Sequence, residues 1–378
     1  MSERQAPLAD LTVLELCQNV AGPYAGLILA ALGARVVKVE RPGRGDDART
    51  WGPPFWDGES VMFAVMNAGK ESVALDLSND VDRGTLLTLV DRADVVLANW
   101  RPGALERLGL AAEDLRRRRP RLIYCSISSF GSDGPLVAAR GYDPLIQAFC
   151  GLMATTGEPG GEPVRVGTSI IDMGAGIWAA LSVLAALRQR DQTGVGAHVT
   201  GSLLETGLAW LPYQGVGYLA TGEEPRRLGS AMPMLVPYQA FPTLDGHLVV
   251  AVGNDPLWQR LCAALGREDL GRDPALATNP QRVAARERVV TELTTAFAQR
   301  TAREWEDALQ AAGVPCSTVQ SVAAALAHPQ TQAVEMFAPM PDRRMEGLAL
   351  PGLPFMLDGV RPRPARSHPD LDEHGDAV

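Results

Sequence analysis

Residues 11–40 read LTVLELCQNVAGPYAGLILAALGARVVKVE. They predict a strand over residues 11–17, a helix over residues 22–32 and a second strand over residues 34–39, because short β-branched runs flank an apolar run of helical length. The next hundred residues repeat this alternation. Further strands are expected at residues 72–77, 94–99 and 121–126, with a helix over residues 81–93. Helices of about 12 residues between short strands indicate βαβ units, and therefore an α/β fold with a parallel sheet.

The second half of the chain has a different pattern. After a loop rich in Gly, Pro and Arg near residues 221–237, two short apolar runs flank an Asp-Gly turn and predict a hairpin of residues 238–241 and 247–252. Helical segments follow, and the residues Thr301 to Glu304 form a capping box before a helix. This block predicts a small α+β domain, and the Pro-rich residues from 351 onward predict an extended arm.

Asp172 is the most informative single residue. It follows an apolar run (residues 164–171) that predicts a strand, and it precedes Met-Gly-Ala-Gly, which opens a helix predicted to be buried over residues 174–190. A carboxylate at such a turn lies at the rim of the sheet, where open α/β folds bind ligands. The small residues after it leave room for a ligand to approach the backbone. The same position also suits a helix N-cap, and the local sequence alone favours this second interpretation.

Composition excludes several classes of function. The net charge of −9 argues against nucleic acid as the main partner. No apolar run reaches the roughly 20 residues that span a bilayer, and we expect a cytoplasmic protein. The five cysteines lie far apart, and the five histidines, none before His198, show no metal-ligand spacing. We therefore expect reduced cysteines and no metal site.

The 35 basic residues include only two lysines, Lys38 and Lys70. Codon bias toward arginine explains this scarcity. The alternative, that a lysine persists where a compact ammonium is required, stays open, above all for Lys70 in the loop NAGKES, since lysine and arginine are not interchangeable.

The loop QNVAGPYAG (residues 18–26) joins the first strand to the first helix, whose N-terminus can bind an anion. Glu40 ends the second strand, where dinucleotide-binding folds place the acid that contacts the ribose. The loop lacks the GxGxxG pattern, so a nicotinamide dehydrogenase is a weak alternative. Basic residues in loops after strands suggest an anion site as a set: Arg41, Arg44, Lys70, Arg101 and Arg107.

Segments spread over nearly the whole chain match one known family in order. They are LTVLELCQNVAGPYAG, LGARVVKVERPGRGDDART, NAGKESVALDL, ANWRPGALERLG, IYCSISSFGSDGP, GYDPLIQAFCGLMATTG, VGTSIIDMGAG, TGVGAHV and VPYQAF followed by DGHLVVAVGN. The chain resembles the class III CoA-transferases, a family that includes formyl-CoA and carnitine-CoA transferases and α-methylacyl-CoA racemase.

The resemblance implies a role for Asp172 as a nucleophile that forms an acyl-aspartyl anhydride and then an aspartyl-CoA thioester. Gly174 and Gly176, with neighbouring N–H groups, would stabilise the oxyanions. CoA is then a substrate, and the chemistry needs no metal or redox cofactor. The family's CoA contacts map onto Asn19, Ala21, Arg41, Leu75, Asn99, Trp100, Arg107, Arg140 and Tyr142. Arg41 and Arg107 are the expected partners of the adenine or phosphates.

The resemblance also implies the architecture. We expect a Rossmann-like large domain from residues 1–200 and 326–378, a linker at residues 201–222 and a small domain at residues 223–325. Relatives form interlocked homodimers, so the same is expected here. The expected partners are acyl-CoA and carboxylic acid substrates and a second copy of the chain, with neither nucleic acid nor a membrane.

Two departures from the family bear on the substrate. Val20 stands where formyl-CoA transferases have glutamine, and the segment GSAMPMLVPYQ lacks their glycine-rich flap, so formyl or oxalyl transfer is disfavoured. The remaining sequence is most similar to transferases that use succinyl-CoA and dicarboxylic acids. Candidates to bind a second carboxylate are Arg49, Arg226 and Arg227, each of which also suits a surface position.

Two other functions fit the sequence less well. A 2-methylacyl-CoA racemase needs a basic histidine where this chain has Tyr142, which is a poor base at neutral pH. A catalytically idle CoA-binding or regulatory protein would not need Asp172 in its full motif. A dicarboxylate CoA-transferase is the favoured function.

Overall fold

The computed structural model describes residues 6–377. The chain divides into two compact units. The first runs to Leu152 and also includes Arg165–Glu223 and the chain from Val334 onward. The second contains Met153–Val164 and Glu224–Ala333. Each unit is described by itself below.

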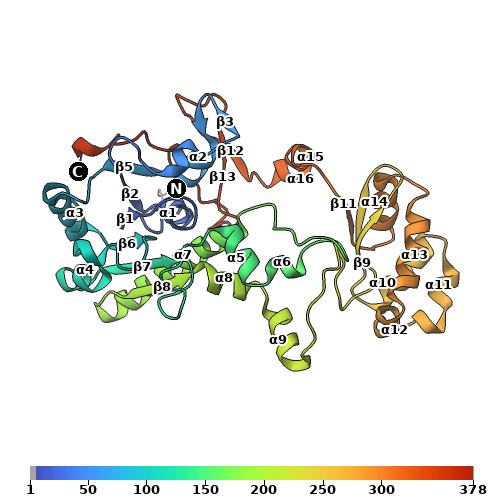
Figure 1. Ribbon diagram of the computed structural model, residues 1–378. Helices are drawn as coiled ribbons and strands as arrows, with labels where there is room; N and C mark the ends of the chain where they lie inside the picture. Colours follow the sequence, from blue (N-terminus) through green and yellow to red (C-terminus); the bar gives the residue numbers. More distant parts are fainter. Residues whose placement is uncertain (1–5, 378) are drawn as a thin grey trace. The chain divides into compact units, whose positions relative to one another are not determined.

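The core of the first unit is a six-stranded sheet in the order β5-β2-β1-β6-β7-β8 (Figure 1). All its neighbouring strands are parallel. This order is the one found in doubly wound dinucleotide-binding folds. The strands are β1 (Thr12–Leu16), β2 (Arg35–Glu40), β5 (Lys70–Ala74), β6 (Val95–Ala98), β7 (Ile123–Ser128) and β8 (His198–Ser202). The predicted large parallel sheet is confirmed.

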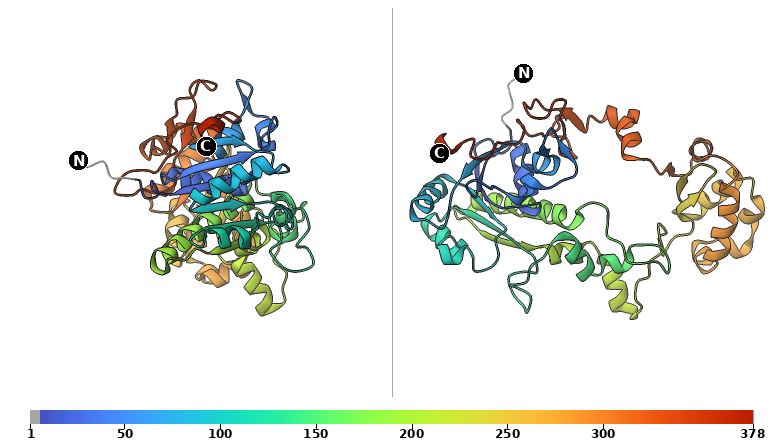
Figure 2. Two further views of the ribbon diagram at one scale, coloured as in Figure 1. Left: turned by 90° about the vertical axis from the view of Figure 1, so that its left-hand side faces the viewer. Right: turned by 45° about the horizontal axis from the view of Figure 1, so that its top comes forward.

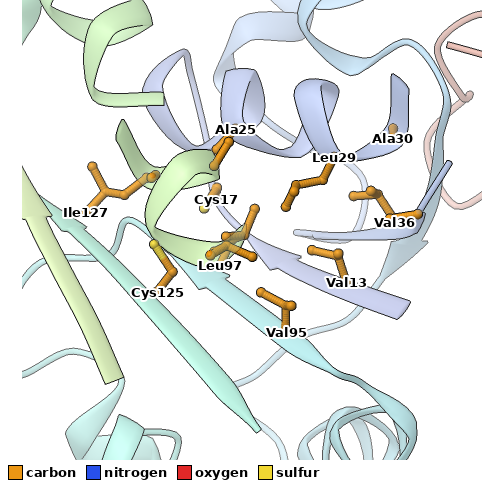
Figure 3. Packing of buried hydrophobic residues seen from close by; sticks show 14 of the residues in the cluster. Val13, Cys17, Ala25, Leu29, Ala30, Val36, Val95, Leu97, Cys125 and Ile127 are labelled. Atoms are coloured by element: carbon orange, nitrogen blue, oxygen red, sulfur yellow. The ribbon is translucent and has the colours of Figure 1, made fainter. Parts of the chain in front are cut away.

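The helices of the first unit cover both faces of this sheet. Helices α1 (Ala21–Ala31) and α7 (Ile170–Thr193) contribute to one apolar core, and α3 (Asp80–Arg92) and α4 (Ala112–Arg118) contribute to the other. Figure 3 shows the first core, in which side chains of α1 lie over those of β1, β2 and β6. The smaller elements are β3 (Phe55–Trp56), β4 (Glu59–Ser60), α2 (Val61–Asn67), α5 (Asp143–Phe149), β12 (Phe337–Pro339) and β13 (Ala349–Pro351).

Helix α7 is long and apolar enough to cross a membrane by length and composition. Half of its most apolar window is buried inside the protein, as in the core helix of a globular domain. The strand predicted over residues 164–171 is absent, because α7 already begins at Ile170. Gly167 and Ser169 interrupt the β-branched run that suggested the strand. Asp172 therefore lies in the first turn of a helix rather than at the end of a strand.

The two glycines after Asp172 serve helix packing. A Cβ atom at Gly174 would lie 2.9 Å from atoms of Thr206 and Trp210, and one at Gly176 would lie 2.7 Å from the backbone oxygen of Ala21. The space that the sequence analysis assigned to a ligand is therefore occupied by neighbouring parts of the first unit.

Two further differences from the predictions concern the rest of this unit. Residues 201–222, expected to be a linker, contain α8 (Leu203–Ala209) and α9 (Pro212–Thr221). The C-terminal arm does pack against the domain, since His368 is buried and the N–H of His374 donates to Ser72 O at 3.0 Å. Figure 2 shows this red segment beside the blue strands at the β5 edge.

The second unit has a three-stranded antiparallel sheet in the order β11-β10-β9. The predicted hairpin is confirmed as β9 (Tyr238–Pro242) and β10 (His247–Ala251), and β11 (Cys316–Thr318) completes the sheet. The Thr301 capping box opens α14 as predicted. The helices are α10 (Asp255–Ala264), α11 (Glu268–Arg272), α12 (Asn279–Ala284), α13 (Arg286–Phe297), α14 (Ala302–Ala311), α15 (Val322–Ala327) and α16 (Pro329–Ala333), and α6 (Leu152–Thr155) lies earlier in the chain.

The contact between α1 and α7 can be tested with Gly176→Ala. The added methyl group meets backbone that cannot rotate away, so we expect a loss of about 1–3 kcal/mol in the free energy of unfolding, measured in guanidinium chloride. Gly84→Ala is the control, because a Cβ on this residue of α3 has no neighbour within 4 Å, and it should be neutral or stabilise by up to about 1 kcal/mol. Equal effects of the two substitutions would contradict the packing assignment.

Candidate functional site

A cavity of about 490 Å³ lies at the carboxyl ends of the strands in the first unit. The loops after β1 and β6 form part of its wall. These two strands are neighbours, and the chain leaves β1 toward β2 on one side and later returns to β6 on the other. The cavity is therefore at the topological switch point of the sheet, where open α/β folds bind ligands. It is lined by Gln18, Asn19, Val20, Ala21, Arg41, Asp47, Asn99, Trp100, Arg101, Pro102, Ile127, Ser128, Ser129, Ala139, Arg140, Gly141, Tyr142, Asp172 and Leu203.

Asp172 is held at this cavity by a second carboxylate, Asp143. Asp143 Oδ2 accepts the backbone N–H groups of Ile171 at 2.8 Å and of Asp172 at 3.2 Å. These are free donors of the first turn of α7, so Asp143 caps the helix from a distant part of the chain. Gln147 Nε2 donates to the other oxygen of Asp143, and Gln147 Oε1 accepts from Val166 N.

The N-cap interpretation of Asp172 is wrong. Ser169 occupies the N-cap position of α7, three residues earlier, and Asp143 supplies the cap that Ser169 does not. The side chain of Asp172 therefore has no structural role in starting the helix, and it is free to face the cavity.

The carboxyl group of Asp172 binds a proton unusually well. Burial, and to a lesser extent the charge of Asp143, raises the pKa of Asp172 from 3.8 to about 7. Both causes disfavour the charged form of an acid. A carboxyl group at a cavity whose pKa has moved toward neutrality has the properties of a reactive group.

The cavity brings together eight of the ten residues that the resemblance assigned to the site: Asn19, Ala21, Arg41, Asn99, Trp100, Arg140, Tyr142 and Asp172. The other two, Leu75 and Arg107, are not among the lining residues. Leu75 is packed in the core on the α3 side of the sheet, and Arg107 lies in a short 3-10 helix. Their assignment to CoA binding stays a prediction.

Asn99 and Asn19 shape the cavity wall. Asn99 Oδ1 accepts from Gln18 N at 3.0 Å and its Nδ2 donates to Gln18 O at 2.8 Å, which joins the loops after β6 and β1. Asn19 has a φ of 68°, in the left-handed region. Its N–H donates to the carboxylate of Asp46 at 3.0 Å.

Three arginines line the cavity. Arg41 forms an ion pair with Asp47 at 2.7 Å. Arg101 and Arg140 have no carboxylate within ion-pair distance anywhere in residues 6–377. Their charges are therefore available to an anionic ligand. In the sequence, the position of Arg101 after a predicted strand indicated only a general anion site and not a specific contact.

The structure argues against Arg49 as a carboxylate-binding residue. Arg49 pairs with Glu40 at 2.7 Å and lies 3.9 Å from the ring centroid of Phe63, outside the cavity lining. Arg226 and Arg227 belong to the second unit, where Arg227 Nη2 donates to Gly161 O at 2.8 Å.

The cavity lining also bears on the needs of a racemase base and of a metal site. No histidine lines the cavity within the described chain, and the lining includes Tyr142, the residue that the family resemblance places where a racemase has its base. Residues 6–377 contain no group of three or more His, Cys, Asp or Glu side chains arranged to hold a metal ion.

Comparison with known proteins decides the family. The family model described as CoA-transferase family III matches residues 8–375. The chain belongs to this family. It is 38% identical over 376 residues to an acetyl-CoA:oxalate CoA-transferase from Acetobacter aceti, with 99% of this chain and 95% of the relative covered. It is also 38% identical over 382 residues to a succinate–glutarate CoA-transferase from Agrobacterium fabrum, with the same coverage.

A solved structure supports the same assignment. The crystal structure of a CAIB/BAIF family protein from Brucella suis aligns with a TM-score of 0.88 at 37% identity, covering 99% of this chain and 98% of that one. The predicted membership of CoA-transferase family III is thus confirmed, and the chain is an enzyme of this class. The dehydrogenase alternative is not supported.

The link between Asp143 and Asp172 predicts a pH dependence. In the wild-type CoA-transferase, kcat/KM should fall as the pH drops below about 7, because a protonated Asp172 is not a nucleophile. Asp143→Asn removes the like charge, so the pKa of Asp172 falls and this limb moves to lower pH. The ratio of kcat/KM at pH 6 to that at pH 8 should rise by about two- to fivefold, because burial, the larger cause of the raised pKa, remains.

Asp191→Asn is the control for that experiment. Asp191 is exposed on the same helix, α7, and its substitution should leave the acid limb in place. An acid limb that does not move in Asp143→Asn would show that Asp143 does not tune the titrating group.

Proposed function

We propose that this enzyme moves CoA from an acyl-CoA donor, which we take to be succinyl-CoA, to a carboxylic acid by covalent catalysis at Asp172. The observation that supports this most directly is the position of Asp172. Its carboxyl group lies in the cavity wall, its backbone is held by Asp143, and its pKa is near neutrality. At pH 7–8 a large fraction of the group is the carboxylate that a nucleophile must be.

The reaction consists of acyl exchanges that balance without a proton or an electron. The Asp172 carboxylate attacks the thioester carbonyl of the donor, the C–S bond breaks, and an acyl-aspartyl anhydride and CoA thiolate form. The thiolate attacks the aspartyl carbonyl and releases the donor acid, leaving an aspartyl-CoA thioester. The acceptor carboxylate displaces the thiolate to give a new anhydride, whose acceptor carbonyl the thiolate attacks. Acyl-CoA leaves, and Asp172 is a carboxylate again.

The surroundings of Asp172 suit these steps. Anhydride and thioester intermediates are lost if water reaches them, and a partly buried carboxylate is shielded from water. The free charges of Arg101 and Arg140 suit phosphate or carboxylate groups of the substrates. In this mechanism CoA is a substrate, and no metal or redox cofactor takes part.

We infer that the acceptor is a dicarboxylic acid. A relative named for succinate and glutarate is 38% identical to this chain, and a succinyl-CoA:mesaconate CoA-transferase from Haloarcula hispanica is 37% identical. Oxalate was disfavoured above because of Val20, a residue that lines the cavity, and because the segment GSAMPMLVPYQ lacks a glycine-rich flap. A relative named for oxalate is as similar as the one named for glutarate, so identity does not support that exclusion and oxalate belongs among the acids to be tested.

The experiment is thioester exchange. The enzyme is incubated with succinyl-CoA and a panel of acids (glutarate, mesaconate, itaconate, citramalate, hydroxymethylglutarate, carnitine and oxalate), and new CoA esters are measured by mass spectrometry. We expect a new ester from at least one diacid. Asp172→Ala should lower the rate by about 10³-fold or more, because covalent catalysis is then lost.

Asp191→Ala on the exposed side of α7 is the matched control and should keep full activity. Turnover that persists in Asp172→Ala would overturn the nucleophile assignment. Exchange with none of the acids, together with solvent deuterium entering a 2-methylacyl-CoA, would identify a racemase instead.

We further propose that the enzyme is an interlocked homodimer and acts in the cytoplasm. An apolar face of the first unit supports the dimer. Ile177, Trp178 and Leu181 of α7 are each about half exposed, and the ring of Trp178 lies 6.4 Å from that of Trp210. Large exposed apolar surfaces on soluble proteins mark contacts with a partner.

Sedimentation velocity tests the dimer. The wild-type enzyme should sediment as a dimer, and Leu181→Arg should shift it toward the monomer or lower its solubility, because a charge would be buried at the interface. Val81→Arg is the control, since Val81 is 79% exposed on α3, away from this face, and it should leave the dimer intact. A wild-type enzyme that sediments as a monomer would contradict this proposal.

A further inference from the structure

The two lysines of the chain are both buried in the first unit, in one cluster of ion pairs. The side chain of Lys38, on β2, is fully buried and its ammonium has three acceptors. It donates to Glu15 Oε1 at 3.0 Å and to Cys17 O at 2.9 Å, and it pairs with Asp46 Oδ2 at 2.9 Å. Three acceptors match the three N–H donors of an ammonium.

Lys70, on β5, is buried in the same cluster, and burial lowers its pKa to about 8. Its side chain is fully buried, its Nζ pairs with Glu15 Oε2 at 2.7 Å, and it donates to Pro23 O at 2.8 Å and Asn67 Oδ1 at 2.9 Å. Glu15 therefore bridges the two lysines. A guanidinium is planar and has five donors, so it would leave donors unpaired in either place. The open question about the lysines is thus answered for both: each stands where a compact ammonium is required.

The two lysines differ in whether their partners connect them to the cavity. Lys38 connects to the cavity through Asp46, whose carboxylate also accepts Asn19 N at 3.0 Å and Ala48 N at 3.0 Å. Asn19 lines the cavity, and so does Asp47, the residue between Asp46 and Ala48. The acceptors of Lys70 are Glu15, Pro23 and Asn67, none of which is a lining residue.

Asn19 has a left-handed backbone, a conformation that asparagine adopts more readily than most other residues with a side chain. Its N–H is bound by the buried carboxylate of Asp46, which fixes the position of the loop. Asp46 holds Asn19 through its N–H and also caps the short helix at Asp47–Thr50. One buried carboxylate therefore fixes two separate segments of the wall.

The charge of Lys38 keeps Asp46 in place. Burial lowers the pKa of Lys38, but Asp46, Glu15 and Glu40 outweigh this effect and hold the pKa above its ordinary value. Lys38 is thus an ammonium at neutral pH. A buried carboxylate without such a partner would be strongly destabilised.

We propose that Lys38 and Asp46 are a positioning pair for the CoA substrate: they hold the Asn19 loop and the Asp47 segment in the shape that binds it. The proposal rests on the proposed function, because it takes the cavity to be the CoA site. Neither residue touches the substrate, and both act through Asn19 and Asp47. Lys70 belongs to the same buried cluster but has no part in this positioning.

The experiment compares Lys38→Met with Lys70→Met. Both remove one ammonium from the same bridging Glu15, so both should lower the melting temperature. The affinity for CoA is measured by isothermal titration calorimetry in an Asp172→Ala background, where no turnover occurs. Lys38→Met should weaken CoA binding by about tenfold or more, the size expected when a hydrogen bond to a charged group is lost. Lys70→Met should stay within about twofold of the parent.

Steady-state kinetics give a second readout. With Asp172 intact, Lys38→Met should raise KM for succinyl-CoA far more than it lowers kcat, and Asp46→Asn should do the same. The double variant Lys38→Met/Asp46→Asn removes one charge of each sign, so it serves if Lys38→Met does not fold. It too should bind CoA more weakly than Lys70→Met does.

The outcomes separate this proposal from the proposed function. If the Asp172→Ala parent does not bind CoA, the CoA site itself is wrongly assigned. If the parent binds CoA, and the Lys38 and Lys70 variants lose affinity equally or keep it equally, the positioning role is overturned. Selective loss in the Lys38 and Asp46 variants supports it.

Discussion

A buried carboxylate on the central strand governs how the first unit is built. Glu15 lies on β1 with no exposed surface, where an unpaired charge would cost several kcal/mol. Lys38 lies directly across from it in the register of β2, and Lys70 reaches it from β5. The charge requirement thus ties three neighbouring strands together. It also explains why α1 has a glycine at residue 26, since a Cβ there would lie 1.9 Å from Glu15 Oε2.

At the site, too, the backbone is held by side chains from distant parts of the chain. The loop after β1 has its N–H groups bound by side chains from elsewhere, through Asn99 and Asp46. The first turn of α7 is held in the same way by Asp143. Because distant side chains satisfy the backbone, Asp172 needs no structural partner. Burial then raises the pKa of the Asp172 carboxyl group. A carboxylate with a raised pKa suits the proposed role of acyl acceptor.

Most strands of the first unit were predicted from the sequence, and the predictions that failed did so for physical reasons. The predicted strands lie within one to three residues of those observed, because their alternation with helices of regular length is a strong local signal. Strand β8, with the sequence HVTGS, carries a glycine and polar residues and gave no such signal. The apparent strand before Asp172 failed because a β-branched run does not become a strand without a neighbour to pair with. Of the ten residues assigned to the site by family resemblance, Leu75 and Arg107 do not line the cavity, and their assignment to CoA binding stays a prediction.

The sequence by itself determined the alternation that makes a parallel sheet, the family, and Asp172 as the residue of interest. Each of these depends on residue types and spacing along the chain. Only the tertiary structure decided that Asp143 caps α7 and that the two lysines share Glu15. It also decided that Arg49 is paired, whereas Arg101 and Arg140 have no carboxylate partner among residues 6–377. These facts depend on which groups meet across gaps of up to tens of residues. A charge is free or paired only in relation to neighbours that folding brings together.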